Sequence, residues 1–365
     1  MKRVIIITML LVTTLVARAF SFSKATNEGQ VLYYTINGNN VTVVAPNGSD
    51  WSGYAKPTGR LAIPASVTYN NTTYAVTAIG DMAFQECTGL TSVTIPGSVT
   101  TIGSRAFSYA ESMRSVFMNE GVQNINMMAF SSCTTLDTIV LPESLTRIAK
   151  DVFTNSGYFN NTDNWNEDKT LVICHWIVAV GNTVDTPVAI ADTIVGIANN
   201  AFFWCRYMPK VTIPASVQYI GEMAFSRCMV LDTVRMLSPN PPALPDNAFA
   251  DMPLPTIAVP CGSVDAYQSA DVWNTMNIHE DPCDVPPVNP NAIDNCSMQS
   301  IEWHPTSNGV VVMNAEGSRL HVVDAMGRTV AHINHAAQCQ HIVLPAAGLY
   351  LLTANGAAIK ICYLK

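Results

Sequence analysis

The string IGEMAFSRCMVL, at 220–231, brings together Glu222, Arg227 and Cys228, a combination that looks like an active-site motif. Nearly the same string, IGDMAFQECTGL, occurs at 79–90. Four cysteines share one position, three residues after a phenylalanine: Cys87, Cys133, Cys205 and Cys228. Other copies place Ala110, Ser156 and Met252 there. Because a position that accepts Ala and Met is a small apolar slot, which free Cys also fits, we expect these cysteines to pack rather than react.

The shared position belongs to a repeat of 23 residues. Phenylalanine marks seven copies: Phe84, Phe107, Phe130, Phe153, Phe202, Phe225 and Phe249. The copies follow the pattern L-x-x-V-x-I-P-x-S-V-x-x-I-G-x-x-A-F-x-x-C. A fixed period of about 20 to 29 residues with apolar residues at L-x-x-L-x-L spacing is the signature of a leucine-rich-repeat solenoid. We therefore predict such a solenoid over residues 61–283, built from about seven units.

Each repeat contains the elements of one coil. The V-x-I segment predicts a short strand with both apolar side chains inward, and the next residue, Pro, ends the pairing because it has no amide proton. The S-V-x-x-I segment adds a second apolar layer, and A-F-x-x-C closes the coil with Phe as the core filler. One coil cannot bury this face alone, whereas stacked coils can. We expect a parallel β-sheet, with strands ~4.8 Å apart, connected by irregular or short helical turns.

The repeat frame is interrupted between Phe153 and Phe202, which are 49 residues apart. An irregular rung is predicted over 157–196, with a polar loop at 160–169 and a strand at 171–180. Its large aromatic residues are expected to pack this coil rather than to form a ligand site: Tyr158, Trp165 and Trp176.

Both ends of the array have the features of caps, which solenoids need to cover their terminal cores. Residues 20–60 are predicted to form a capping hairpin with Asn37-Gly38 at its turn. Prolines and a short helical stretch break the frame at 238–283, which we interpret as the closing cap. Residues 284–300 then form a Pro/Asn-rich linker.

The first 19 residues have the pattern of a secretory signal peptide: Lys2 and Arg3, an apolar run, and an A-x-A cleavage site after Ala19. No other apolar stretch is long enough to cross a membrane, so we expect an exported protein without a transmembrane helix. The net charge is -8 and only 13% of residues are charged. Without a basic cluster in the remaining chain, nucleic acid is not an expected partner.

The 23-residue unit resembles the BspA-like leucine-rich repeats of Bacteroidetes surface proteins, and the resemblance covers about residues 30–279. The segment VPCGSVDAYQSADVW, at 259–273, is similar to those that end such arrays. The resemblance implies a cell-surface protein that binds ligands through its solenoid.

The tail, 301–365, alternates apolar and polar residues and predicts a small antiparallel β-sandwich. It also resembles the C-terminal sorting domain of the type IX secretion system. The residues that carry this resemblance include Asp324, Gly327, Arg328, Gly348, Tyr350 and Lys360. The resemblance implies the secretion machinery as a partner, transport across the outer membrane, removal of this domain and attachment of the remainder to surface lipopolysaccharide.

Two groups of residues have the side-chain types that a disulfide or a metal site requires. Cys261 and Cys283 flank the closing cap and are the best disulfide candidates. A second group has a spacing that superficially suggests zinc: His332, His335, Cys339 and His341. We expect no metal there, because the group lies in a loop of a domain that the sorting resemblance implies is discarded. No catalytic or cofactor-binding motif occurs, so we predict neither an enzyme nor a bound cofactor.

Binding is the activity that the repeat favours. On each predicted strand the residues beside and between the apolar pair point outward, giving the candidate ligand-binding set Thr94, Phe117, Val140, Lys210 and Arg235. Phe117 and Val140, on successive rungs, form an exposed apolar pair of the kind found at contact surfaces. We predict an adhesin-like module for a host matrix protein, another surface protein or a glycan. The alternatives are a structural scaffold without a specific ligand and, third, an enzyme or glycan-processing accessory protein, and the oligomeric state stays open.

Overall fold

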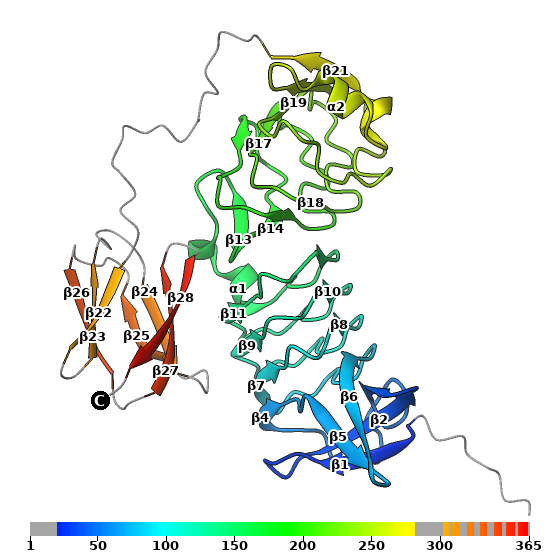
Figure 1. The fold of residues 1–365 in the computed structure, drawn as a ribbon, viewed down its shortest axis with the longest axis vertical. Coiled ribbons are helices and arrows are strands. Elements are labelled where there is room, and N and C mark those ends of the chain that lie inside the picture. The colour runs from blue at the N-terminus through cyan, green and yellow to red at the C-terminus, as the bar shows by residue number, and fades with distance from the viewer. Residues whose placement is uncertain are drawn as a thin grey trace, which may run out of the picture.

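A computed structural model describes residues 20–281, seven strands between 302 and 363, and Leu344. The main body is a stack of coils that runs from the N-terminal strands to the closing cap (Figure 1). Each coil contributes to three faces, so the inward side chains of successive coils make one continuous core. The predicted parallel solenoid is therefore confirmed.

The longer strands of successive coils form two parallel sheets, which we call the front face. The first sheet contains β4 (Gly59–Ala62), β7 (Leu90–Ile95), β9 (Ser115–Met118) and β11 (Thr138–Val140). The second contains β15 (Val188–Ala189), β17 (Lys210–Ile213), β19 (Thr233–Met236), β20 (Thr256–Val259) and β21 (Asn277–Glu280). Their alternate residues are buried, as the V-x-I pattern predicts for strands with one face on a core.

A second face begins with the long strand β6 (Thr72–Ile79) and otherwise carries strands of two residues. The first part contains β6, β8 (Thr101–Ile102), β10 (Asn124–Ile125) and β12 (Arg147–Ile148), in parallel register. The later part contains β16 (Gly196–Ile197) and β18 (Tyr219–Ile220). Each ends on the Ile of the repeat, which is buried and supplies the second apolar layer of the coil.

The A-F turns form the third face and carry the phenylalanines into the core. The first stack consists of Phe84, Phe107, Phe130 and Phe153, with successive ring centroids 5.0, 5.1 and 5.8 Å apart. The second stack consists of Phe202, Phe225 and Phe249, at 4.8 and 5.2 Å. In both stacks the Phe amide donates to a carbonyl of the next turn, for example Phe84 N to Ala106 O at 2.7 Å. These bonds hold the rings in register, so the turns stack as regularly as the strands.

The N-terminal segment covers the first coil with antiparallel strands. β1 (Phe22–Ala25) pairs with β2 (Val31–Asn37), which forms a hairpin with β3 (Asn40–Val44). β5 (Ser66–Tyr69) pairs with β6, and β3 joins β6 in parallel, which connects the cap to the solenoid. Trp51 stacks on Phe84 with centroids 6.1 Å apart and donates its indole N–H to the Ala83 carbonyl. The cap therefore closes the end of the first stack with an aromatic ring.

The irregular rung contains α1 (Gly157–Asn160), a short 3-10 turn η1 (Thr162–Asn164), and the strands β13 (Thr170–Ile173) and β14 (Trp176–Val180). The prediction of one strand over 171–180 is wrong. β13 and β14 form an antiparallel hairpin, because Cys174 adopts a left-handed backbone (φ 52°) that reverses the chain. On both faces, the sheet of the first half ends here and a separate sheet begins. The backbone N–H of Asn199 donates to the Ile148 carbonyl across this break, at 2.9 Å.

The last coil is closed by α2 (Val264–Gln268) and a second 3-10 turn, η2 (Trp273–Thr275). Tyr267 and Trp273 are buried against each other, with ring centroids 5.2 Å apart. The Tyr267 hydroxyl donates to the Ser238 carbonyl and the Trp273 indole donates to the Pro242 carbonyl, which fixes the helix over the core.

The tail strands form two antiparallel sheets. One contains β22 (Glu302–Thr306), β23 (Gly309–Met313) and β26 (Cys339–Val343). The other contains β24 (Leu320–Asp324), β25 (Thr329–Ile333), β27 (Gly348–Ala354) and β28 (Ala357–Tyr363). Packing of the two sheets as a sandwich stays a prediction. The predicted signal peptide and linker lie outside the described residues.

Candidate binding surfaces

Three of the predicted ligand-binding residues lie side by side on the first sheet of the front face. Thr94 is the register partner of Phe117, and Phe117 is the partner of Val140, so the three occupy one column across β7, β9 and β11. All three side chains are half-buried. This column, which we call the Phe117 strip, is narrow and apolar, with the Thr94 hydroxyl at one end.

Lys210 and Arg235 lie on the second sheet and belong to different columns. Because the sheets are separate, the structure does not bring these two residues together with the Phe117 strip. Arg235 Nε donates to an Asp281 carboxylate oxygen at 2.6 Å, and its side chain is only 12% exposed. Arg235 therefore connects β19 to the end of the last coil.

Lys210 occupies a repeat position that the alternation of residues predicts to be exposed. On three earlier strands, however, the residue at this position is buried. These residues are Ser92, Ser115 and Thr138. The front face is thus less open along this column than the alternation of residues suggests.

An exposed apolar ridge lies on the turns that follow the second Phe stack. Nine large hydrophobic side chains are exposed among the described residues, and five of them belong to this ridge: Trp204, Tyr207, Met229, Val230 and Leu254. Their exposed fractions run from 37% to 59%. Three of them fall five residues after successive phenylalanines: Tyr207, Val230 and Leu254. The repeat therefore places them at one position on three consecutive coils.

Two arginines pack against the aromatic part of the apolar ridge. The Arg206 guanidinium lies 4.5 Å from the centre of the Trp204 ring, and that of Arg227 lies 5.4 Å from it. Arg227 also pairs with Asp251 on the next coil, at 3.3 Å. An aromatic and arginine surface of this kind resembles the composition of protein interfaces, in which both residue types are enriched.

The sequence analysis did not identify the apolar ridge, although a signal was present. The alternation of apolar and polar residues predicts which residues point outward on the front-face strands, and it does not extend to the turns. The residue five positions after each Phe changes from Gly89, Ser112 and Thr135, through the half-buried Tyr158 of the irregular rung, to Tyr207, Val230 and Leu254.

The repeat cysteines are buried and free, as the packing interpretation predicts: Cys87, Cys133, Cys205 and Cys228. Burial raises the pKa of the Cys87 and Cys133 thiols to about 12. The Cys133 and Cys228 thiols donate to the carbonyls of Phe107 and Phe202, at 3.2 and 3.1 Å. A protonated, buried thiol is a poor nucleophile, so these residues support the core.

The other residues considered for chemistry lie in or near the closing cap and the tail. Cys261 is disulfide-bonded, whereas Cys283 lies outside the described residues, so their pairing stays a prediction. The prediction that the His/Cys group of the tail lies in a loop is wrong for three of its members, because His332 lies on β25 and Cys339 and His341 lie on β26, while His335 lies outside the described residues. The His332 and His321 rings have centroids 5.5 Å apart. Where the structure describes the chain, it contains no group of three or more potential metal ligands.

The sorting-signal residues are placed only in part. Asp324, Gly348 and Lys360 lie on β24, β27 and β28. Tyr350 is buried and pairs in register with Asp324. Gly327 and Arg328 lie outside the described residues. Their role in sorting stays a prediction.

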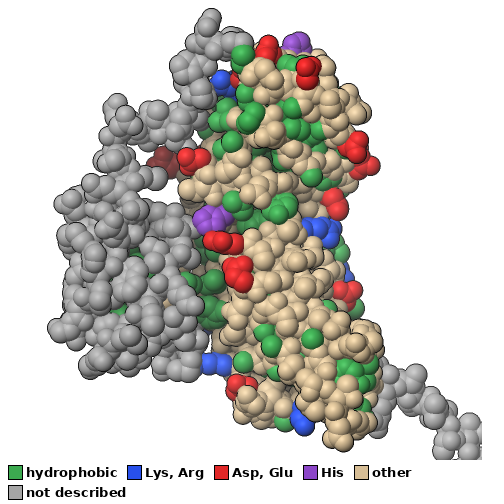
Figure 2. Space-filling view, viewed as in Figure 1, with side chains coloured by type: hydrophobic (Ala, Val, Ile, Leu, Met, Phe, Trp, Pro, Cys, Tyr) green, Lys and Arg blue, Asp and Glu red, His purple; other side chains and the backbone are tan. Residues whose placement is uncertain are grey.

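Charged residues are sparse on the surface shown in Figure 2, where uncharged polar side chains and backbone predominate. No helix within the described ranges is long and apolar enough to span a bilayer.

Comparison with known protein families gives a match to the BspA type leucine-rich-repeat region, in six copies, over residues 65–170 and 195–310. The gap between the matched segments coincides with part of the irregular rung. No match was found among curated proteins. No catalytic family is indicated.

Several solved structures are similar to this chain. A leucine-rich-repeat protein from Bacteroides capillosus is 37% identical over 31% of this chain and 80% of its own, with a TM-score of 0.28. A leucine-rich cell surface protein from Faecalibacterium prausnitzii is 20% identical over 75% and 98%, with a TM-score of 0.25. The leucine-rich-repeat protein of T. pallidum is 18% identical over 72% and 78%, with a TM-score of 0.28. The family match covers more than half of this chain, so the chain belongs to the BspA type leucine-rich-repeat family.

Proposed function

We propose that this protein is a secreted cell-surface module that binds another protein through its solenoid, in the manner of an adhesin. The observation that carries the proposal is the apolar ridge of five exposed side chains on three consecutive coils. Monomeric soluble proteins rarely expose contiguous large apolar patches, and such patches mark contact sites. The Phe117 strip is a second apolar surface, smaller and less exposed.

The composition of the apolar ridge favours a protein as the ligand. Trp204 and Tyr207 are large anchors that lose little conformational entropy on binding, and Arg206 adds a cation held against an aromatic face. Such anchors fit apolar pockets on a partner, with the surrounding polar residues as a rim. A scaffold without a ligand would not need this surface, because exposed apolar groups promote aggregation.

Binding of matrix proteins by the full-length chain tests the proposal. We expect the double variant Tyr207→Ser with Leu254→Ser to lose at least tenfold in affinity for immobilised host matrix proteins. Tyr109→Ser is the matched control, since Tyr109 is an equally exposed aromatic on a turn of the first stack. Equal binding by all three proteins would show that the apolar ridge is not the contact surface, and no binding by any of them would favour the structural scaffold.

Export by type IX secretion is a separate part of the proposal, supported by the sorting-signal residues of the tail. Deletion of residues 301–365 is expected to leave the protein in the periplasm, because the secretion machinery would have no signal to bind. Surface labelling of intact cells, with Arg328→Ala as a point variant, measures this. Undiminished labelling of the truncated chain would rule out the tail as the sorting signal.

A further inference from the structure

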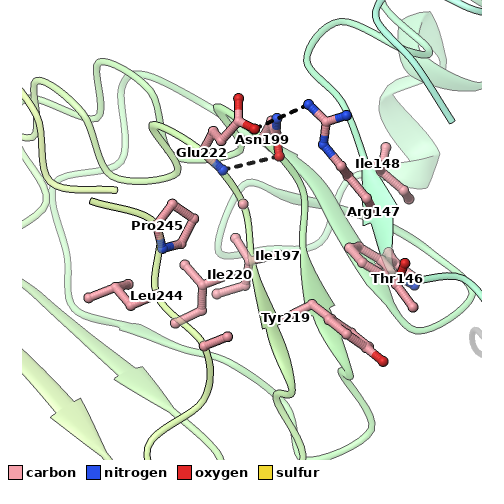
Figure 3. Close-up of a pocket in the computed structure, with 13 residues that line it drawn as sticks. Thr146, Arg147, Ile148, Ile197, Asn199, Tyr219, Ile220, Glu222, Leu244 and Pro245 are labelled. Atoms are coloured by element: carbon pink, nitrogen blue, oxygen red, sulfur yellow. Dashed lines mark hydrogen bonds and ion pairs between the residues drawn. The ribbon is translucent and has the colours of Figure 1, made fainter. Parts of the chain in front are cut away.

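The break between the two halves of the solenoid contains a groove. It consists of two adjoining pockets with volumes of about 260 and 350 Å³. Residues Trp176 and Tyr219 line both pockets. Arg147 and Glu222 line the first pocket (Figure 3), whereas Glu143 and Gln218 line the second. The groove therefore runs along the break, with the aromatic pair at its centre.

A glycine creates the aromatic pair. Gly196 is the register partner of Trp176 on one side and of Tyr219 on the other. A Cβ at Gly196 would lie 2.5 Å from the Trp176 ring. Without that atom, the Trp176 ring lies over β16 and stacks on Tyr219, with centroids 5.9 Å apart and planes 10° from parallel. Trp176 is 3% exposed and Tyr219 is half-buried, so Trp176 packs as predicted and also supports the more open ring.

Polar groups surround this ring on both sides. Figure 3 shows the Arg147–Glu222 pair along one side of the first pocket and Tyr219 along another. Arg147 and Glu222 are 3.2 Å apart and join coils from the two halves. Buried Asn199 fixes Glu222 by accepting its backbone N–H at 3.1 Å. In the second pocket, the His175 ring is held by the Thr193 carbonyl at 3.0 Å.

The chemistry of the groove narrows the class of ligand. Each pocket is near or below the lower end of the usual range for ligand pockets, roughly 300–1,000 Å³, so each suits one small ring. An aromatic face binds the C–H face of a pyranose, while amide, carboxylate and guanidinium groups bond its hydroxyls as donors and acceptors. The lining is mainly apolar, with Ile197, Ile220 and Leu244 in the first pocket, and a phosphate would find Glu143 and Glu222 among its few charged groups.

We propose that the groove binds a saccharide, with one sugar ring in each pocket and the Tyr219 ring between them. Arg147, Glu222 and Gln218 bond the hydroxyl groups. The site adds a ligand class to the binding function proposed above and lies on residues distinct from the apolar ridge. A substitution can therefore abolish binding at one surface without affecting binding at the other.

Titration of the full-length protein with named disaccharides tests the site. The probes are lactose, maltose, N-acetyllactosamine and N,N′-diacetylchitobiose, followed by saturation-transfer NMR and by tryptophan fluorescence. We expect at least one to bind with a Kd at or below about 1 mM. Tyr219→Ala should weaken that binding at least tenfold, whereas Tyr219→Phe, which keeps the ring, should retain most of it.

Further variants keep the test decisive if Tyr219→Ala does not fold. Arg147→Gln and Glu222→Gln change exposed side chains and leave the core intact, and each should weaken binding at least threefold. The double ridge variant Tyr207→Ser with Leu254→Ser should bind the saccharide like wild type, which separates this site from the protein-binding surface. Absence of binding by all four probes, or equal binding by the groove variants and wild type, would overturn the proposal.

Discussion

The two Phe stacks have the same interior and different exteriors. In both, ring centroids are about 5 to 6 Å apart and the Cys position packs against the core, although Ser156 is polar and Met252 is half-buried. After the first stack the exposed turn positions carry mainly Thr, Glu and Ser, with Tyr109 as a single large exception among the described residues, whereas after the second they include Tyr, Met, Val and Leu. Stacking requires the same inward shape on every coil but sets no requirement on outward residues. A surface can therefore change from polar to apolar along one solenoid without a change of fold.

The exteriors also differ in how they connect the coils. On the first half, hydroxyl groups bond carbonyls of the preceding coil: Thr135 Oγ1 donates to Glu111 O at 2.7 Å, and Ser144 Oγ donates to Val122 O at 2.9 Å. On the second half, Ser216 Oγ makes the equivalent bond to the Ile194 carbonyl at 2.7 Å, and Arg227 and Asp251 also connect neighbouring coils through their side-chain charges. Both exteriors therefore satisfy backbone carbonyls, and the second also leaves aromatic and aliphatic groups available for contact.

The largest expected effect concerns the shared interior. Phe130→Ala and Phe225→Ala each remove a buried ring from between two others and should each lower the free energy of unfolding by ~3–5 kcal/mol. Phe153→Ala, at the end of its stack, removes one ring contact and should cost less. Urea unfolding measures these values. A loss below ~1 kcal/mol for Phe130 or Phe225 would mean that the stacks do not carry the core.

Alkaline pH should produce the next largest effect, through the buried thiols of the first stack. The pKa of Cys87 and Cys133 is about 12 in the folded chain and near 9 when unperturbed. Above pH 9 the unfolded chain loses these protons while the folded chain keeps them. The contribution of these thiols to stability is therefore complete below about pH 9 and is lost progressively as the pH rises toward 12.

Cys133→Ala is the matched variant for this pH dependence, because Ala110 occupies the same position one coil earlier. Urea unfolding between pH 8 and pH 11 should show a shallower decline for the variant than for wild type. Parallel declines would show that the Cys133 thiol ionises equally in both states.

The smallest effect is expected on the exterior of the second stack. Leu254→Ser changes a side chain that is 59% exposed and should alter the free energy of unfolding by no more than ~0.5 kcal/mol. Phe249→Ser, five residues earlier, changes a buried ring and should be far more harmful. A similar loss for both would place Leu254 in the core and remove it from the apolar ridge.

Much of the fold could be predicted because the repeat encodes it directly. The positions of Phe84 to Phe153 fix the coil length, and the V-x-I alternation fixes which residues of β7 and β9 are buried. The irregular rung could not be predicted in the same way. A continuous apolar segment at 171–180 is compatible with one strand or with a tight hairpin, and the left-handed Cys174 that decides between them has no clear sequence signal.

The candidate sites show the same limit. The Thr94, Phe117 and Val140 column follows from strand periodicity alone, and the structure places these residues in register. Arg235 has the same outward pattern, but its bond to Asp281 depends on how the chain returns 46 residues later. The groove depends on contacts between Arg147, Trp176 and Glu222, which lie on coils from both sides of the break.

The sequence by itself determined the repeat length, the inward residues and the family, because identical coils stack only if their buried side chains recur at identical positions. The tertiary structure decided which outward residues are free and which are used within the protein. It also decided that the interruption leaves a groove. Both depend on distances between coils that are far apart in the chain, and a single repeat carries no information about them.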